Sequence, residues 1–330
     1  MNRYMKCIWP KCFIFIITLG LCAPLVALDF EVIDTASEDG IPLSIGKIKI
    51  LSVVRLFTTS KNNLDLVELS ALAWSEDENI LYALSDHGAL FHFKPEFDNA
   101  GLSNIQLLDA FPLIGASGED LSYPWSDSEG LYLKNGNNGR KGDDALLVSF
   151  ELKPRLQWHQ PDGQFIKKEA LPEWLESKAN YYKRHKALES VSIHPEYGVI
   201  TAPELPMQDA DWQLLTLYRA DGGELTTSRD AQKEMSICAI ETLPEGDLLI
   251  LERRHSLLAP TWTTRLTRLS VGTGAKLERD LVASMTVGGR MPVDNYEGLT
   301  RHRDNRYFMV SDNNEHFMQQ TLLVYFELLP

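Results

Sequence analysis

The sequence predicts an all-β protein, a β-propeller built from five four-stranded blades, on three observations. Short runs rich in β-branched and aromatic residues are separated by Gly, Asp, Asn and Pro along most of the chain, which is the pattern of strands joined by turns. A pair of such runs recurs five times, and each pair carries acidic residues at matching places. The repeat is roughly 50 to 60 residues long with about four strands, as propeller blades are.

The first 27 residues have the composition of a secretory signal peptide. Basic residues and no acidic ones precede the apolar stretch CFIFIITLGLC, and small residues lead up to Ala27. The segment is too short for a membrane-spanning helix. We therefore expect cleavage after Ala27, a periplasmic or secreted protein, and a single propeller domain over residues 28–330. Attachment of a lipid at Cys22 is the weaker alternative, because leucine stands where that signal requires a small residue.

The charge of the remaining chain argues against nucleic acid and anionic membranes as partners. The sequence has 32 Lys and Arg against 46 Asp and Glu, and three of the basic residues lie in the leader. The other 303 residues therefore carry 29 basic and 46 acidic side chains, a net charge of −17. Such a protein repels polyanions and attracts cations. No later run of 18 apolar residues is present, so we expect no membrane span after the leader is removed.

Cysteine usage indicates that the fold depends on an ordinary hydrophobic core. Three of the four cysteines lie in the leader, which leaves Cys238 alone. An exported chain with one thiol forms no internal disulfide, and 303 residues suffice to bury a large core. Because a propeller closes its own sheet edges, we also expect a monomer.

The inner strands of the five blades come first in each repeat. The pairs are ELSALAW (68–74) with ILYALSD (80–86), SEGLYLK (128–134) with ALLVSFE (145–151), LESVSIHP (188–195) with GVITAPE (198–204), ICAIETLP (237–244) with DLLILER (247–253), and YEGLTRH (296–302) with RYFMVSD (306–312). Four first strands open on glutamate, at Glu68, Glu129, Glu189 and Glu297. All five second strands end on an acid, at Asp86, Glu151, Glu204, Glu252 and Asp312.

The remaining elements complete the wheel. Each pair is followed by outer-strand candidates such as ALFHFKP, WQLLTLYRA and QTLLVYFELL. The last unit has only three strands before the chain ends, and the early strand over residues 48–57 is expected to supply the fourth and close the ring. A short helical insertion is predicted near 172–186. A sixth, degenerate blade stays open as an alternative.

The glycine-rich segment 135–142 joins two strands and has no following helix, which favours a hairpin loop over a phosphate-binding loop.

The repeated acids predict a metal site on the propeller axis. Inner strands line the axial channel, so nine carboxylates at equivalent places are expected to meet in one funnel. They cannot all stay ionised there, so either several pKa values rise or a cation is bound. Oxygen ligands without a Cys or His pair favour Ca²⁺ over Zn²⁺. The predicted ligands are Glu129, Glu189, Glu204, Glu297, Asp312 and Asn313. For any single acid the alternative is a turn-capping role.

Basic residues beside the acids predict a place for an anionic substrate. Arg253 follows Glu252, Arg301 follows Glu297, and Lys186 precedes Glu189. Guanidinium groups bind phosphate and carboxylate oxygens bidentately, although these groups serve equally well to neutralise the acids. Arg253 is expected on the strand face opposite to Glu252, which weakens a joint role. His316 follows the last acids closely enough to reach the funnel.

Several segments resemble a known family. LSALAW…LYALSD, DSEGL, SFELKPRL, LESVSIHP…TAPE, LILERR and YEGL…VSDNNEHFMQQTLLVYFEL are similar to the phytase-like family, "esterase-like activity of phytase", of exported bacterial proteins. The resemblance covers about residues 45–328, and the closing EGL…SDNN…QT segment is its most specific part. It implies a propeller that acts on phosphate esters.

Two functions of different classes follow. The first is a periplasmic, Ca²⁺-dependent hydrolase of small phosphate esters or phosphodiesters. Glu189, Glu297 and Arg253 are its predicted catalytic residues, and Arg301, Lys186 and His316 bind the substrate. The second is a non-catalytic propeller with structural Ca²⁺ that binds an envelope protein, a glycan or a small ligand, because the fold alone does not choose between enzyme and platform.

Overall fold

The computed structural model describes residues 28–36, 41–99, 101–229, 235–256, 261–272 and 276–330. The predicted leader, residues 1–27, lies outside them. No helix within the described residues is long and apolar enough to cross a membrane.

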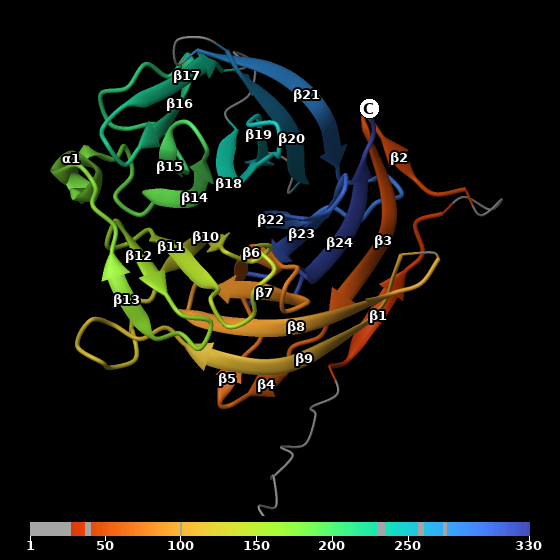
Figure 1. The fold of residues 1–330 in the computed structure, drawn as a ribbon. Coiled ribbons are helices and arrows are strands. Elements are labelled where there is room, and N and C mark those ends of the chain that lie inside the picture. Colours follow the sequence, from red (N-terminus) through yellow and green to blue (C-terminus); the bar gives the residue numbers. More distant parts are fainter. Residues whose placement is uncertain (1–27, 37–40, 100, 230–234, 257–260, 273–275) are drawn as a thin grey trace, which may run out of the picture.

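The strands form five antiparallel sheets arranged as blades around a central axis (Figure 1). The predicted all-β propeller is therefore confirmed, with five blades in the described residues. Four of the blades follow one another along the chain. The first comprises β6 (Leu69–Ser75), β7 (Ile80–Ser85), β8 (Ala89–Phe97) and β9 (Leu102–Pro112); the second β10 (Ser128–Lys134), β11 (Ala145–Phe150), β12 (Arg155–His159) and β13 (Phe165–Lys168); the third β14 (Leu188–His194), β15 (Gly198–Pro203), β16 (Leu214–Arg219) and β17 (Glu224–Ser228); the fourth β18 (Ser236–Thr242), β19 (Leu248–Ser256), β20 (Thr261–Val271) and β21 (Leu277–Thr286). In each, the strand that comes first in the sequence is innermost.

The fifth blade joins the two ends of the chain. Its inner strands are β22 (Asn295–Arg303), β23 (Arg306–Asp312) and β24 (Thr321–Leu328), and β3 (Ile48–Leu56) pairs with β24 from the other end. Ring closure by the early strand is thus confirmed. Two elements were not predicted here: β1 (Phe30–Ile33) pairs outside β3, and β2 (Ser44–Ile45) pairs with its start. A small hairpin of β4 (Ser60–Lys61) and β5 (Leu64–Asp65) leads into the first blade.

The helical insertion is shorter than predicted. Only α1 (Glu173–Glu176) and the 3₁₀ turn Lys178–Asn180 are helical. Ser177 between them is extended and no side chain caps either turn, so the helix has no stabilised end. Tyr181 beyond them is buried and donates its hydroxyl to the carbonyl of Leu175. The extended backbone at Ser177 and Tyr181 ends both helical turns.

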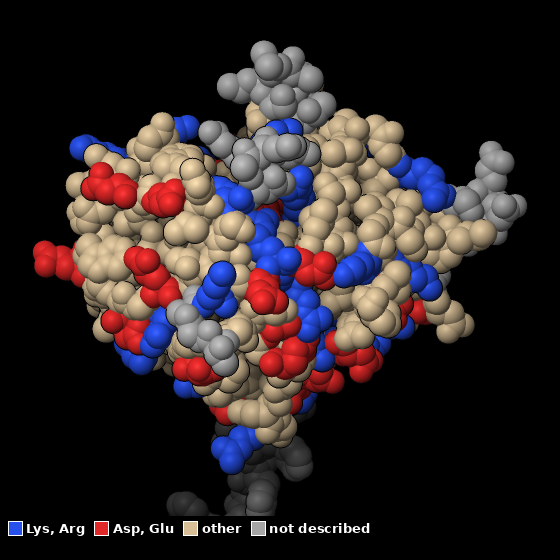
Figure 2. Space-filling model, turned by 90° about the horizontal axis from the view of Figure 1, so that it is seen from above, with Lys and Arg blue, Asp and Glu red and all other residues tan. Residues whose placement is uncertain are grey.

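Burial explains why the second strand of each blade reads as a nearly continuous apolar run. Every residue of β11 from Leu146 to Phe150 is buried, because adjacent blades cover both faces of the sheet. The hydrophobic core is divided accordingly into clusters, one of which contains residues of both the fourth and the fifth blade. On the edge of the wheel that Figure 2 shows, basic and acidic side chains lie intermixed. An exposed ion pair between Lys47 and Asp280, at 2.5 Å, joins the fifth blade to the fourth.

Candidate active site: an acidic funnel at one end of the axis

A β-bulge occurs at the same place in each innermost strand. The register of the pairing shifts once near the start of all five strands, and the residues at the shift are Ser70, Glu129, Glu189, Cys238 and Glu297. A bulge redirects a side chain out of the regular pleat. Three of the predicted glutamates hold this position. Glu68 does not: it lies two residues before the bulge, with a φ of 49°, and serine occupies the equivalent place in the first blade.

A second set of equivalent residues lies at the end of each second strand. These residues pair with the residue two positions before the bulge, and they are Asp86, Glu151, Glu204, Arg253 and Asp312. The prediction that Glu252 belongs to this set is wrong. Its carboxylate accepts from Thr267 at 2.7 Å and Arg279 at 2.8 Å on the outer strands. Because neighbouring side chains in a strand point to opposite faces, Arg253 takes the place of an acid in the fourth blade.

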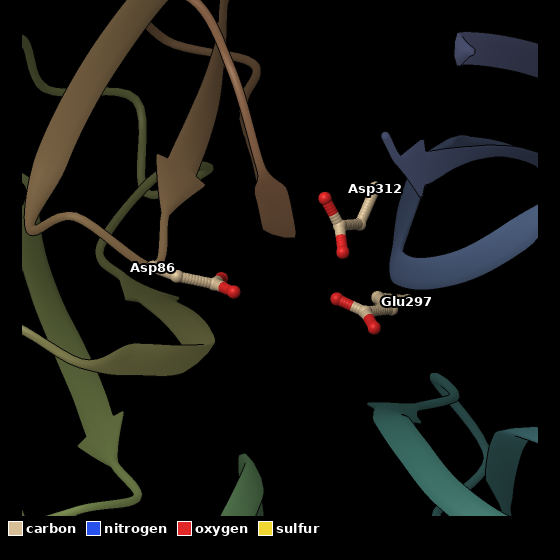
Figure 3. A group of neighbouring side chains, drawn as sticks. All are labelled: Asp86, Glu297 and Asp312. Atoms are coloured by element: carbon tan, nitrogen blue, oxygen red, sulfur yellow. The ribbon is translucent and has the colours of Figure 1, made fainter. Parts of the chain in front are cut away.

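The acids gather in three groups. In each group one carboxylate oxygen per residue lies within 4.8 Å of the others. The groups are Asp86 with Glu297 and Asp312; Asp127 with Glu129 and Glu151; and Glu151 with Glu189 and Glu204. Figure 3 shows the first group, in which Asp86 reaches from the end of β7 toward two carboxylates of the last blade. The acids at the strand ends of four different blades therefore lie in one region, and we call these three groups the acidic funnel.

Arg253 is the buried cation of this region. Only 8% of the residue is exposed. Nη1 donates to Glu297 and to Asn295, while Nη2 lies 3.5 Å from Glu189 and 3.6 Å from Glu204. The guanidinium thus joins the third, fourth and fifth blades.

Two polar side chains complete the contacts on either side of the arginine. Lys186, on the loop before β14, forms a second ion pair with Glu204. Asn295 donates to Glu297 at 2.8 Å and to Asp312 at 3.1 Å. Both side chains therefore hold carboxylates of the funnel at fixed positions.

Burial changes the protonation of the acids. It raises the pKa of Asp86 and Glu129 well above their usual values, and neighbouring carboxylates add to the effect. Burial also raises the pKa of Glu151 to about 9 and that of Glu189 to about 8. Glu204 is different, because Arg253 and Lys186 outweigh burial and lower its pKa. Without a bound cation, several of these groups hold a proton at neutral pH.

The funnel fits a hard divalent cation. Oδ1 of Asp86 and Oε1 of Glu151 are buried and have no hydrogen-bond partner within the described residues. Each of the three groups contains one of these two residues. A buried acceptor left unpaired is costly, and a cation would satisfy it. The donors are all oxygens, which is the ligand set of Ca²⁺ and not of softer metals.

The comparison with protein families identifies the chain. The model of the phytase-like family, described as esterase-like activity of phytase, matches residues 65–315. The chain belongs to this family. A search of curated proteins found no match. The resemblance of these sequence segments to the family is therefore confirmed, and the acidic funnel lies within the matched segment.

The phytase-like funnel contains most of the predicted site residues but not all of them. Glu129, Glu189, Glu204, Glu297, Asp312, Arg253 and Lys186 lie in or beside it. Oδ1 of Asn313 instead accepts from the backbone N–H groups of Glu68 and Glu315, the turn-capping role. His316 is exposed on the loop that follows. Arg301 lies near the other end of β22 and donates to the carbonyl of Asp304.

Residues missing from the predicted ligand set also reach the phytase-like funnel. Asp86 and Glu151 belong to the repeat but not to the predicted ligand set, and the repeat of glutamates does not include Asp127 and Asn295. A signal for the last two was present. Polar residues stand two positions before the bulge in four blades, at Glu68, Asp127, Ser236 and Asn295, but an alignment on the glutamates matches Glu68 with the bulge residues of the other blades.

Small residues close the channel beneath the funnel. The residues after the bulges are Ala71, Gly130, Ser190, Ala239 and Gly298. A Cβ added to Gly130 would lie 2.8 Å from the Cα of Ser190, and one added to Gly298 would lie 3.1 Å from the Cα of Ala71. The inner strands therefore approach closely. The space left between them is about 10 Å³, room for roughly one water molecule. The acids are therefore separated from the other end of the axis.

Proposed function

We propose that this phytase-like protein is a Ca²⁺-dependent hydrolase of small phosphate esters or phosphodiesters that works in the periplasm or outside the cell. The observation that carries the proposal is the convergence of three carboxylate groups and one buried arginine in one region at the end of the axis. The family description supports an esterase-type reaction.

The acids that form no ion pair with Arg253 are the best Ca²⁺ ligands. Asp86 and Glu151 each have a buried oxygen without a partner among the described residues, and Glu129 and Asp312 lie in their groups. When bound, the ion would neutralise these carboxylates and polarise a phosphoryl oxygen of the ester. Asn313 is better suited to shaping the turn.

The residues around Arg253 would bind the substrate and accept the proton of the attacking water. The pKa of Glu189 is raised to about 8 by burial, which suits a general base near neutral pH. Glu297 accepts from Arg253, so its role is to hold the guanidinium in place. The Lys186 side chain is about 30% exposed and is the first cation that an anionic ester meets. Nη2 of Arg253 is beyond good hydrogen-bond distance from both nearby glutamates, so neither of them keeps its N–H groups from binding an oxyanion.

Hydrolysis assays test this function. The protein is incubated with p-nitrophenyl phosphate, bis-p-nitrophenyl phosphate and phytate, with Ca²⁺ and with a chelator. We expect turnover that the chelator abolishes and that the double variant Glu189→Gln, Glu297→Gln loses. Glu252→Gln is the matched control, because this buried carboxylate points away from the funnel. Turnover that persists in chelator, or no turnover of any substrate, contradicts the proposal.

The second candidate is a non-catalytic propeller in which Ca²⁺ joins the blades and the face binds an envelope protein, a glycan or a small ligand. One observation favours it: Arg253 already connects three blades through carboxylates, which is a structural role for a cation. Calorimetric titration with Ca²⁺ separates the two candidates. Tight Ca²⁺ binding and a raised melting temperature in a protein without turnover would support this second role.

A further inference from the structure

A second cavity lies at the opposite end of the propeller axis. Its volume is about 350 Å³, within the range of small-ligand sites. All five innermost strands, or the turns that follow them, contribute to its wall. The residues that matter for its chemistry are Trp74, Tyr132, Glu241, Thr242, Thr300 and Arg301. Arg301, which sequence reasoning assigned to the funnel, therefore belongs to a different site.

An apolar layer separates this cavity from the acidic funnel. Leu72, Leu131 and Ile240 line both the floor of the cavity and the narrow space beneath the funnel. The inner strands are too close there to leave a passage for anything larger than water. A molecule in the cavity therefore cannot reach the acids of the funnel, and the two ends of the axis are independent sites.

The charges of the cavity disfavour ions as ligands. Glu241 is the central charged group, and burial raises its pKa to about 7, although a hydrogen bond from the Arg301 backbone, the positive charge of Arg301 and the Thr300 hydroxyl all act against the rise. Glu76 lies at the mouth. Two carboxyl groups against one arginine do not attract a phosphate. None of the three carboxylate groups that suit a metal ion within the described residues includes Glu241.

The remaining groups suit a neutral ligand that has both hydroxyl groups and apolar faces. Arg301 offers N–H donors at the wall of the cavity, and a guanidinium group is only a donor. Glu241 and Thr242 offer acceptors on the other wall. Trp74 and Tyr132 add aromatic surface, and Trp74 is held edge-on against His302 with ring centroids 4.5 Å apart.

We propose that this cavity binds a monosaccharide or another cyclic polyol. Such a ring presents hydroxyl groups that both donate and accept, which Glu241 and Arg301 complement. Its C–H faces pack on aromatic side chains. Its size matches a compact cavity, and a neutral ring is not repelled by the two carboxyl groups.

Saturation-transfer NMR tests the assignment. The probes are glucose, galactose, N-acetylglucosamine and myo-inositol at roughly 10 mM, above a millimolar dissociation constant, with inorganic phosphate as the anionic comparison. We expect saturation transfer to at least one of the neutral rings. In Arg301→Gln and in Glu241→Gln, the affinity for that ring should fall by about tenfold, the effect of one hydrogen bond in a charged or buried setting. Arg303→Gln, which changes an exposed arginine outside the cavity lining, is the matched control and should bind normally.

Three results would overturn the assignment: no transfer to any neutral ring in the folded protein, binding that both variants retain, or binding of phosphate alone at this end. Circular dichroism confirms that the variants are folded, and both exchanges to glutamine keep a polar side chain in place. The assay does not depend on the proposed hydrolase, because neither variant touches the funnel. A protein without turnover can still bind the sugar, and loss of sugar binding leaves any chelator-sensitive turnover unchanged.

Discussion

Replacing Arg253 by glutamine tests whether a built-in cation holds three blades together. In the folded protein this guanidinium contacts Glu297 and lies within 3.6 Å of Glu189 and Glu204. All three carboxylates are at least nine-tenths buried. Removing one partner of a buried ion pair usually costs about 3–5 kcal/mol of unfolding free energy.

The surroundings place the expected loss toward the lower end of that range. Lys186 continues to neutralise Glu204. Glu189, whose pKa burial raises to about 8, takes up a proton near neutral pH at small cost. Glu297 is therefore the main carboxylate left without a counter-charge. We expect Arg253→Gln to lose about 3 kcal/mol in the presence of a chelator.

Calcium should partly replace the lost guanidinium. The vacated space is lined by carboxylates, so Ca²⁺ at a hundredfold excess over its dissociation constant would restore about 2.7 kcal/mol. Urea unfolding followed by circular dichroism, with Ca²⁺ and with chelator, measures this increment. Arg279→Gln is the matched control, because Arg279 pairs with the buried Glu252 in the same blade but away from the funnel. An equal calcium increment in wild type and both variants, or a loss below about 1 kcal/mol in Arg253→Gln, would refute the reasoning.

Three further predictions concern other buried groups. Glu252→Gln should lower the unfolding free energy by about 1–3 kcal/mol, since Thr267 and Arg279 lose a charged acceptor. The calcium affinity measured by calorimetry should not change; a tenfold weaker affinity would show that Glu252 belongs to the calcium site. The thiol of Cys238 is 1% exposed and burial raises its pKa, so Ellman's reagent should label it only after denaturation, and rapid labelling of the folded protein would be inconsistent with this position. His159 is fully buried, its Nε2 has no partner among the described residues, and burial lowers its pKa to about 4. The unfolded state, in which the pKa is near 6.5, therefore binds the proton more readily. The stability that the neutral His159 contributes is present above about pH 6.5, and up to about 3 kcal/mol of it is lost as the pH falls toward 4. Urea titrations at several pH values, compared with His159→Phe, should show a flatter pH profile in the variant.

The blades could be predicted from the sequence because their inner strands are marked twice, by apolar runs and by acids at the ends. Closure by residues 48–57 followed from counting three strands in the last unit. The extra strand β1 (Phe30–Ile33) could not be predicted in the same way, because half of it is exposed and its pattern lacks a buried face. The helical insertion was overestimated because the backbone is extended at Ser177 and Tyr181.

The site was harder to predict because aligning the blades on their acidic residues gives the wrong register in two of them. Glu252 was chosen as the strand-ending residue of the fourth blade since it is acidic, whereas the bulge at Cys238 sets the register so that Arg253 faces the funnel. The same error placed Glu68 in the position that belongs to Ser70. Only the pairing geometry shows which residue is displaced by a bulge. A sequence pattern of period two does not contain that information.

The pairing of β3 with β24 has a consequence for how the molecule folds. A side-chain hydrogen bond in this region, from Arg55 to Gln320, connects residues 265 positions apart. Contacts of such long range form late and slow the folding of a domain. A growing chain can therefore complete four blades while the wheel is still an open arc with two exposed strand edges. Until the last residues pair, those edges are available to other chains, so this step is the point at which correct assembly competes with aggregation.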